Sequence, residues 1–184
     1  MYIESMPAPT SHLSTDHFLY TNIYNPLAAK LCFIHPNYVT GASLLLTAPI
    51  VFGLLHGWAL IPFLLIIGLR MILDCMDGAI ARACNLKSKF GSLFDKATDN
   101  IFHIAIIVTL IYILSLKYGF TAWKTQLILW IGILSTITNL YTAFLMEEDE
   151  QMANLHDLVI LVHDNMLLAG LLYGAITWSI ANMF

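Results

Sequence analysis

The chain has few charged residues and few cysteines for its length. Of its 184 residues 11% are charged and 59% are hydrophobic, and the mean hydropathy is +0.76. A typical soluble domain has about 25% charged residues. No basic patch is present, which argues against a nucleic-acid-binding surface. Cys32, Cys75 and Cys84 lack metal-ligand spacing, and their odd number predicts no disulfide framework but small buried residues. We therefore expect an integral membrane protein.

The N-terminal residues lack the apolar core of a signal peptide. Residues 1–24 are polar and are predicted to be a lead-in, followed by one transmembrane domain over residues 25–184. Asn25-Pro26 is suited to opening a short helix, because proline fits the first helical position. An apolar stripe opposite Lys30 predicts that this helix lies at the membrane interface, with a simple linker as the alternative. The stripe consists of Leu27, Leu31 and Ile34.

Long apolar stretches dominate the remaining sequence. A bilayer span needs about 20 residues, and the stretches that meet this need cover residues 38–55, 58–83, 92–116, 122–146 and 166–181. Residues 155–162 are too short to span, because His163-Asp164-Asn165 interrupts them. A sixth span would require those three residues to form a tight turn. The sequence thus predicts an all-α integral membrane protein, a polytopic bundle of five to six transmembrane helices with an N-terminal interfacial helix.

The basic residues are distributed unequally between the two ends of these predicted spans. Lys30, Arg82, Lys87 and Lys89 flank one end, whereas Lys117 and Lys124 flank the other, and no lysine or arginine follows. Because loops rich in lysine and arginine stay in the cytoplasm, the first end is predicted to face the cytoplasm.

A spaced array of polar residues occurs within the second and third predicted spans. It reads Asp74-x-x-Asp77-Gly78-x-x-Ala81-Arg82, then eight residues, then Gly91-x-x-x-Asp95-x-x-x-Asp99. A carboxylate inside a membrane costs about 2.5–3.5 kcal/mol, so such groups indicate a functional site. Each half of the array falls on one helical face. The short connecting loop predicts antiparallel neighbouring helices whose acidic faces converge.

Converging carboxylates require a cation, and their hard oxygens suit Mg²⁺, Mn²⁺ or Ca²⁺. Arg82 offers a planar fork for phosphate oxygens, while Gly78 and Gly91 leave room for a ligand. Together these features predict phosphoryl transfer at a metal. For the single residues there are plainer interpretations: Arg70 is spaced to pair with Asp74 on the same helix, and a lone glycine commonly serves helix packing.

The array resembles the signature of the CDP-alcohol phosphotransferase family at every defined position. A looser similarity covers Asn25-Pro26, Pro36-Asn37-x-x-Thr40 and the neighbouring spans. The resemblance implies a membrane enzyme of phospholipid biosynthesis that transfers a substituted phosphate from a CDP-alcohol to an acceptor alcohol and releases CMP. Its donor would be CDP-diacylglycerol, CDP-choline or CDP-ethanolamine, and the family likeness also implies a homodimer.

The resemblance also implies roles for individual residues. One or two Mg²⁺ or Mn²⁺ ions would be held by Asp74, Asp77 and Asp95, while Asp99 would act as the general base and as a further metal ligand. The cytidine diphosphate would bind at Gly78, Ala81, Arg82 and Gly91. Further phosphate or acceptor contacts would come from Arg70, Lys87 and Lys89.

The acceptor is left open among several classes. Family members with phosphorylated acceptors resemble one another in having basic residues in later helices, and this chain has none after Lys124. A neutral or zwitterionic acceptor is therefore favoured: inositol, serine or diacylglycerol. Alternatives are a phosphatidylglycerophosphate-type synthase and a non-catalytic relative that binds nucleotide or lipid. His156, Asp157, His163 and Asp164 are candidates for an acceptor pocket, with a solvated patch as the alternative; the run Glu147 to Glu150 is predicted to be a solvated loop.

Overall fold

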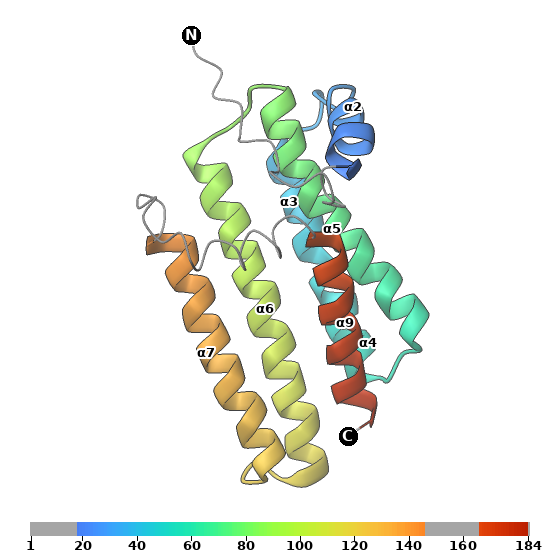
Figure 1. The fold of residues 1–184 in the computed structure, drawn as a ribbon, viewed down its shortest axis with the longest axis vertical. Coiled ribbons are helices and arrows are strands. Elements are labelled where there is room, and N and C mark those ends of the chain that lie inside the picture. Colours follow the sequence, from blue (N-terminus) through green and yellow to red (C-terminus); the bar gives the residue numbers. More distant parts are fainter. Residues whose placement is uncertain (1–17, 146–165, 184) are drawn as a thin grey trace.

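A computed structural model describes residues 18–145 and 166–183, and its regular elements within these residues are all helices (Figure 1). In chain order they are η1 (Tyr20–Tyr24, a π-helical turn), α2 (Asn25–Ala28), α3 (Pro36–Leu45), α4 (Thr47–Leu55), α5 (Leu60–Ala83), α6 (Lys89–Tyr118), α7 (Trp123–Leu145) and α9 (Met166–Met183). The predicted all-α class is confirmed. The expectations for Glu147 to Glu150, for 155–162 and for His156, Asp157, His163 and Asp164 lie outside the described residues, as does most of the lead-in.

The first predicted span is built from two helices rather than one. Leu46 separates α3 from α4, three residues before Pro49. Proline has no amide hydrogen, and its ring collides with the carbonyl four residues earlier, here that of Leu45, so the helix breaks at this point. Hydrogen bonds from the Leu46 amide to Ala42 and from the Ile50 amide to Leu46 keep the two parts roughly in line. The combined stretch, Pro36–Leu55, is still 20 residues long.

The ends of the longer helices follow local sequence signals. Ser88 caps α6, because its hydroxyl accepts a hydrogen bond from the Gly91 amide at 2.9 Å. Gly119 ends that helix with a φ of +87°, a left-handed backbone that glycine adopts without a side-chain clash. His35 caps α3 in the same way as Ser88 caps α6, through Asn37. These caps fix where α3 and α6 begin, at the same end of the bundle (Figure 1).

The helices that carry the polar array are held apart by other helices. Figure 1 shows α5 and α6 running in opposite directions, as the short loop predicts. Their backbones do not pack closely, however; α3 packs against both of them, and α9 packs mainly against α5. Two glycines of α9 allow this close approach, because Gly170 lies against Met71 and Gly174 against Ile67. The space between α5 and α6 is therefore left for their polar side chains.

In the described part of the chain, several charged and polar side chains are buried while many large apolar side chains face outward. The buried side chains include Arg70 and Asp77, whereas Leu65, Val108 and Leu134 are more than half exposed. Such an apolar exterior is suited to lipid, which solvates hydrocarbon and not charge. Among the described residues, Pro36–Leu55 and Lys89–Tyr118 are each long and apolar enough to cross a membrane.

The segment before α3 is attached to the end of α5. Cys32 and Cys84 form a disulfide, with their Cα atoms 5.5 Å apart. The sequence-based expectation of no disulfide was wrong, because an odd number of cysteines still permits one pair; Cys75 is the free, buried one. Residues 18–24, the end of the expected lead-in, are helical, and Tyr24 is buried against the same part of α5.

Candidate active site

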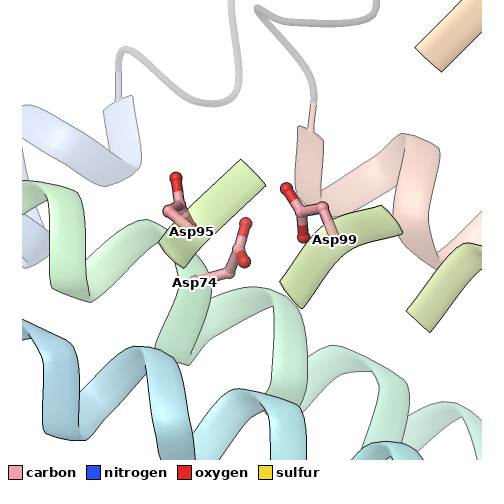
Figure 2. A group of neighbouring side chains, drawn as sticks. All are labelled: Asp74, Asp95 and Asp99. Atoms are coloured by element: carbon pink, nitrogen blue, oxygen red, sulfur yellow. The ribbon is translucent and has the colours of Figure 1, made fainter. Parts of the chain in front are cut away.

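An acidic cluster occupies the space between α5 and α6. Asp74 comes from α5 and Asp95 and Asp99 come from α6, and one carboxylate oxygen from each lies within 4.8 Å of the others. Figure 2 shows the three side chains gathered between these two helices. The predicted convergence of the two acidic faces is thus present for three of the four aspartates, across a gap that α3 and α9 keep open.

The cluster fits a divalent cation. Asp74 Oδ1 and Asp95 Oδ1 are buried and have no hydrogen-bond partner among the described residues. An unpaired buried carboxylate oxygen is costly, and a hard cation provides the missing partner. The three ligands are all oxygen, as Mg²⁺ and Mn²⁺ prefer, and neither histidine nor thiolate takes part.

Asp77 lies about one turn further along α5 than Asp74 and is hydrogen-bonded to α3. Its Oδ2 accepts a hydrogen bond from the Thr40 hydroxyl of α3 at 2.5 Å, and its side chain is 5% exposed. It is not one of the three residues whose oxygens converge, although Asp77 and Asp95 both line the same cleft. The fourth predicted metal ligand is therefore placed at the border between the cluster and the cleft.

Asp99 is paired with Arg70. The Arg70 Nη2 donates to Asp99 Oδ1 at 2.8 Å, so the arginine joins the two helices rather than pairing with Asp74 along its own helix. The predicted pairing of Arg70 with Asp74 was wrong, because the long Arg70 side chain extends across the gap to α6 instead. Arg70 does not line the cleft, whereas Lys87 does; Lys89 is exposed at the start of α6 and lies outside it.

A cleft of about 300 Å³ opens beside the cluster. It gathers Gly78, Ala81, Arg82 and Gly91, the residues predicted to bind the donor nucleotide, from the end of α5 and the start of α6. The full lining is Pro36, Asn37, Thr40, Asp77, Gly78, Ala81, Arg82, Leu86, Lys87, Ser88, Gly91, Ser92 and Asp95. The cleft lining therefore includes both carboxylates, those of Asp77 and Asp95, and basic groups, those of Arg82 and Lys87.

The start of α6 gives the cleft a positive electrostatic character. The first amides of a helix have no internal partners and carry part of the helix dipole, so they attract phosphate oxygens. Ser88 and Gly91 line the cleft at this point, and a Cβ on Gly91 would lie 3.0 Å from the Ser88 hydroxyl and 3.2 Å from Asn37 Oδ1. Glycine at this position avoids these tight contacts and lets the cleft reach the backbone.

Arg82 is oriented by an aromatic neighbour. Its guanidinium carbon lies 5.2 Å from the centre of the Tyr20 ring, within range of a cation–π contact. Burial raises the pKa of Tyr20, so that phenol stays neutral. A Cβ on Gly78 would lie 3.2 Å from Arg82 Nη1, so the glycine leaves the arginine room along the cleft wall.

Some cleft residues were missed as site residues by sequence reasoning. Asn37, Thr40 and Ser88 line the cleft, yet they come from α3 and from the cap of α6. A signal existed for the first two, since Pro36-Asn37-x-x-Thr40 belongs to the looser family similarity. For Ser88 the signal was its position as a helix cap just before Gly91.

A comparison with protein-family models gives a match. Residues 33–181, which is most of the chain and includes the whole polar array, match the family model of CDP-alcohol phosphatidyltransferase. The comparisons with curated proteins and with solved structures found no match. The chain therefore belongs to the CDP-alcohol phosphatidyltransferase family, whose members transfer a phosphate group from a CDP-alcohol to an alcohol in phospholipid biosynthesis.

Proposed function

We propose that this chain transfers a substituted phosphate from a CDP-linked donor to a neutral or zwitterionic acceptor alcohol. The observation that carries the proposal is the adjoining position of the acidic cluster and the cleft, with Asp95 common to both. A nucleoside diphosphate in this cleft would place its phosphates between the start of α6 and the carboxylates. That is the arrangement phosphoryl transfer needs, since the protein's role there is positioning and charge neutralisation.

We propose specific roles for the residues of the cluster. Asp74, Asp95 and Asp99 would hold Mg²⁺ or Mn²⁺, with Asp77 as a ligand from the cleft side, for one or two ions in all. A bound divalent ion supplies neutralisation of charge on the pyrophosphate. Asp99, whose side chain is 47% exposed, can receive the proton of an incoming hydroxyl.

The donor would be held by the cleft's own groups. Arg82 and Lys87 offer charged donors to phosphate oxygens, and the dipole at the start of α6 adds to the attraction. Gly78 and Ala81 present little side chain, so the nucleotide can approach the wall of α5. The donor classes that fit are CDP-diacylglycerol, CDP-choline and CDP-ethanolamine, because the lining offers nothing that selects among their tails.

The acceptor assignment rests on charge. No lysine or arginine follows Lys124 in the sequence, and Lys87 is the lysine that lines the cleft. A phosphorylated acceptor would compete with the donor's phosphates for Lys87 and Arg82. An uncharged or zwitterionic alcohol, such as inositol, serine or diacylglycerol, needs no further cation.

We also propose a multi-pass arrangement with the cleft facing the cytoplasm. Arg82 and Lys89 lie near the cleft end of the bundle, while Lys117 and Lys124 belong to the far ends of α6 and α7 (Figure 1). This grouping supports the orientation that the positive-inside rule predicts. Leu27 and Phe33, both exposed at the cleft end, support an interfacial position for the segment around α2.

The test is CMP release by the purified protein in detergent. CDP-diacylglycerol, CDP-choline and CDP-ethanolamine would each be combined with inositol, serine, glycerol phosphate and diacylglycerol, with Mn²⁺, with Mg²⁺ and with a chelator. We expect metal-dependent CMP release with one donor and a non-phosphorylated acceptor. The Asp99→Asn variant should be slower by about 100-fold, the usual scale of general-base catalysis.

Each alternative outcome has a definite meaning. Turnover with glycerol phosphate alone would overturn the acceptor assignment and indicate a phosphatidylglycerophosphate-type synthase. CDP binding with metal but no CMP release from any pair would favour a non-catalytic relative. Equal rates for Asp99→Asn and the unchanged chain would remove Asp99 as the base.

A further inference from the structure

Arg70 is the most deeply buried charged side chain among the described residues. It is 2% exposed, less than Asp74 or Asp77, and it lies in the middle of the 24-residue helix α5. A buried guanidinium is strongly unfavourable unless it is paired. An apolar residue of similar size would have a lower desolvation penalty at this position. The buried charge therefore indicates a role other than packing.

The surroundings of Arg70 direct it to a single oxygen. Nη2 donates to Asp99 Oδ1 at 2.8 Å, and the guanidinium carbon lies 3.9 Å from the centre of the Phe102 ring. Asp99 and Phe102 are three residues apart on α6, so they present one face to Arg70. The aromatic ring supports the plane of the guanidinium, and the carboxylate fixes its direction.

We propose that Arg70 is a positioning residue for Asp99, an inference that rests on the proposed function. By occupying Oδ1, Arg70 fixes the carboxylate so that Oδ2 alone is presented to the metal and the acceptor hydroxyl. Its positive charge also offsets part of the negative charge of Asp74, Asp95 and Asp99. Arg70 does not line the cleft, so it acts on the acceptor's base and not on the donor.

Two effects of opposite sign follow from this role. Removing the charge should strengthen cation binding, because the acidic cluster becomes more negative. Removing it should also slow turnover, because Asp99 is no longer held in a productive direction. A residue that only stabilised the fold would produce neither effect in the molecules that remain folded.

The test compares Arg70→Met, Arg70→Lys and Lys117→Met in detergent-purified, monodisperse protein. Mn²⁺ binding is measured without substrate from the EPR signal of free Mn²⁺, and kcat and KM are measured for the reactive pair. For Arg70→Met we expect Mn²⁺ to bind about tenfold more tightly. We expect kcat to fall about 10- to 100-fold while the donor KM changes less than about twofold.

The control variants make the result specific. Arg70→Lys keeps the charge, so its Mn²⁺ affinity should return to that of the unchanged chain. Its kcat should recover only in part, because lysine lacks the planar fork. Lys117→Met removes an exposed cation from the last turn of α6 and should leave both quantities unchanged. Unchanged or weaker Mn²⁺ binding in Arg70→Met, or a kcat per folded molecule equal to that of the unchanged chain, would overturn the proposal. A chain that releases no CMP would count against the proposed function, and the Mn²⁺ measurement would still test the effect of Arg70 on the cluster.

Discussion

Replacing Asp74 with asparagine is expected to lower the rate of CMP release on the order of 10,000-fold, which corresponds to about 5 kcal/mol of transition-state stabilisation. Asparagine has the same shape but no charge, and its amide NH₂ group cannot coordinate a cation. Asp74 is 9% exposed, so water cannot readily take the place of its carboxylate as a metal ligand. Its Oδ1 has no protein partner among the described residues, so this oxygen is available to a cation. The same variant should bind Mn²⁺ more weakly by at least about tenfold.

The matched control for this variant is Met76→Leu. Met76 is buried two residues away on α5 but packs in the apolar cluster with Tyr24 and Ala79, not among the carboxylates. This substitution conserves volume and is expected to cost less than about 1.5 kcal/mol of stability, with kcat unchanged. If Asp74→Asn retained activity within about tenfold of the unchanged chain, the acidic cluster would not be the metal centre of the reaction.

Placing valine at Gly91 is expected to lower kcat/KM for the CDP donor about 1,000-fold, or about 4 kcal/mol. The first atom of the new side chain would lie 3.0 Å from the Ser88 hydroxyl and 3.2 Å from Asn37 Oδ1. Both residues line the cleft, so neither can retreat without changing it. Valine would also narrow the cleft at the start of α6, where the donor phosphates are proposed to bind.

Gly41→Ala is the matched control for Gly91→Val. Gly41 lies in α3, and a Cβ at that position meets no atom within 4 Å. Alanine is the better helix former by about 0.5–1 kcal/mol, so this variant should be neutral or slightly stabilising. Mn²⁺ binding should persist in Gly91→Val, because the carboxylates are not displaced. A normal donor KM in Gly91→Val would show that the nucleotide binds elsewhere.

Helix positions were largely predictable from local sequence. The apolar lengths placed the second and third spans close to α5 and α6, and the last predicted span, 166–181, falls within α9. Caps and glycines provide such signals over a few residues. The helical spacing of the polar array also indicated which residues share a face, and Gly78, Arg82 and Gly91 do line one cleft.

Partners between helices were not predictable in the same way. Arg70 has Asp74 four residues ahead of it, yet it pairs with Asp99, 29 residues away. Thr40 bonds to Asp77 across 37 residues. These choices depend on how α3 and α9 separate α5 from α6, which no local pattern encodes. The break at Leu46 had a local cause, Pro49, but apolar length alone did not indicate it.

The oxidation state of the Cys32–Cys84 pair can report which side of the membrane the cleft faces. Cys84 follows Arg82 by two residues, so the oxidation state of the pair reports on the compartment into which the cleft opens. Cytosolic thiols are kept reduced, whereas disulfides persist in secretory and periplasmic compartments. Trapping the thiols in intact cells therefore tests the predicted orientation. The structure places the two cysteines close enough to bond, and in cells the compartment decides whether the bond persists. A reduced pair agrees with a cytoplasmic cleft, and an oxidised pair places CMP release on the opposite side of the bilayer.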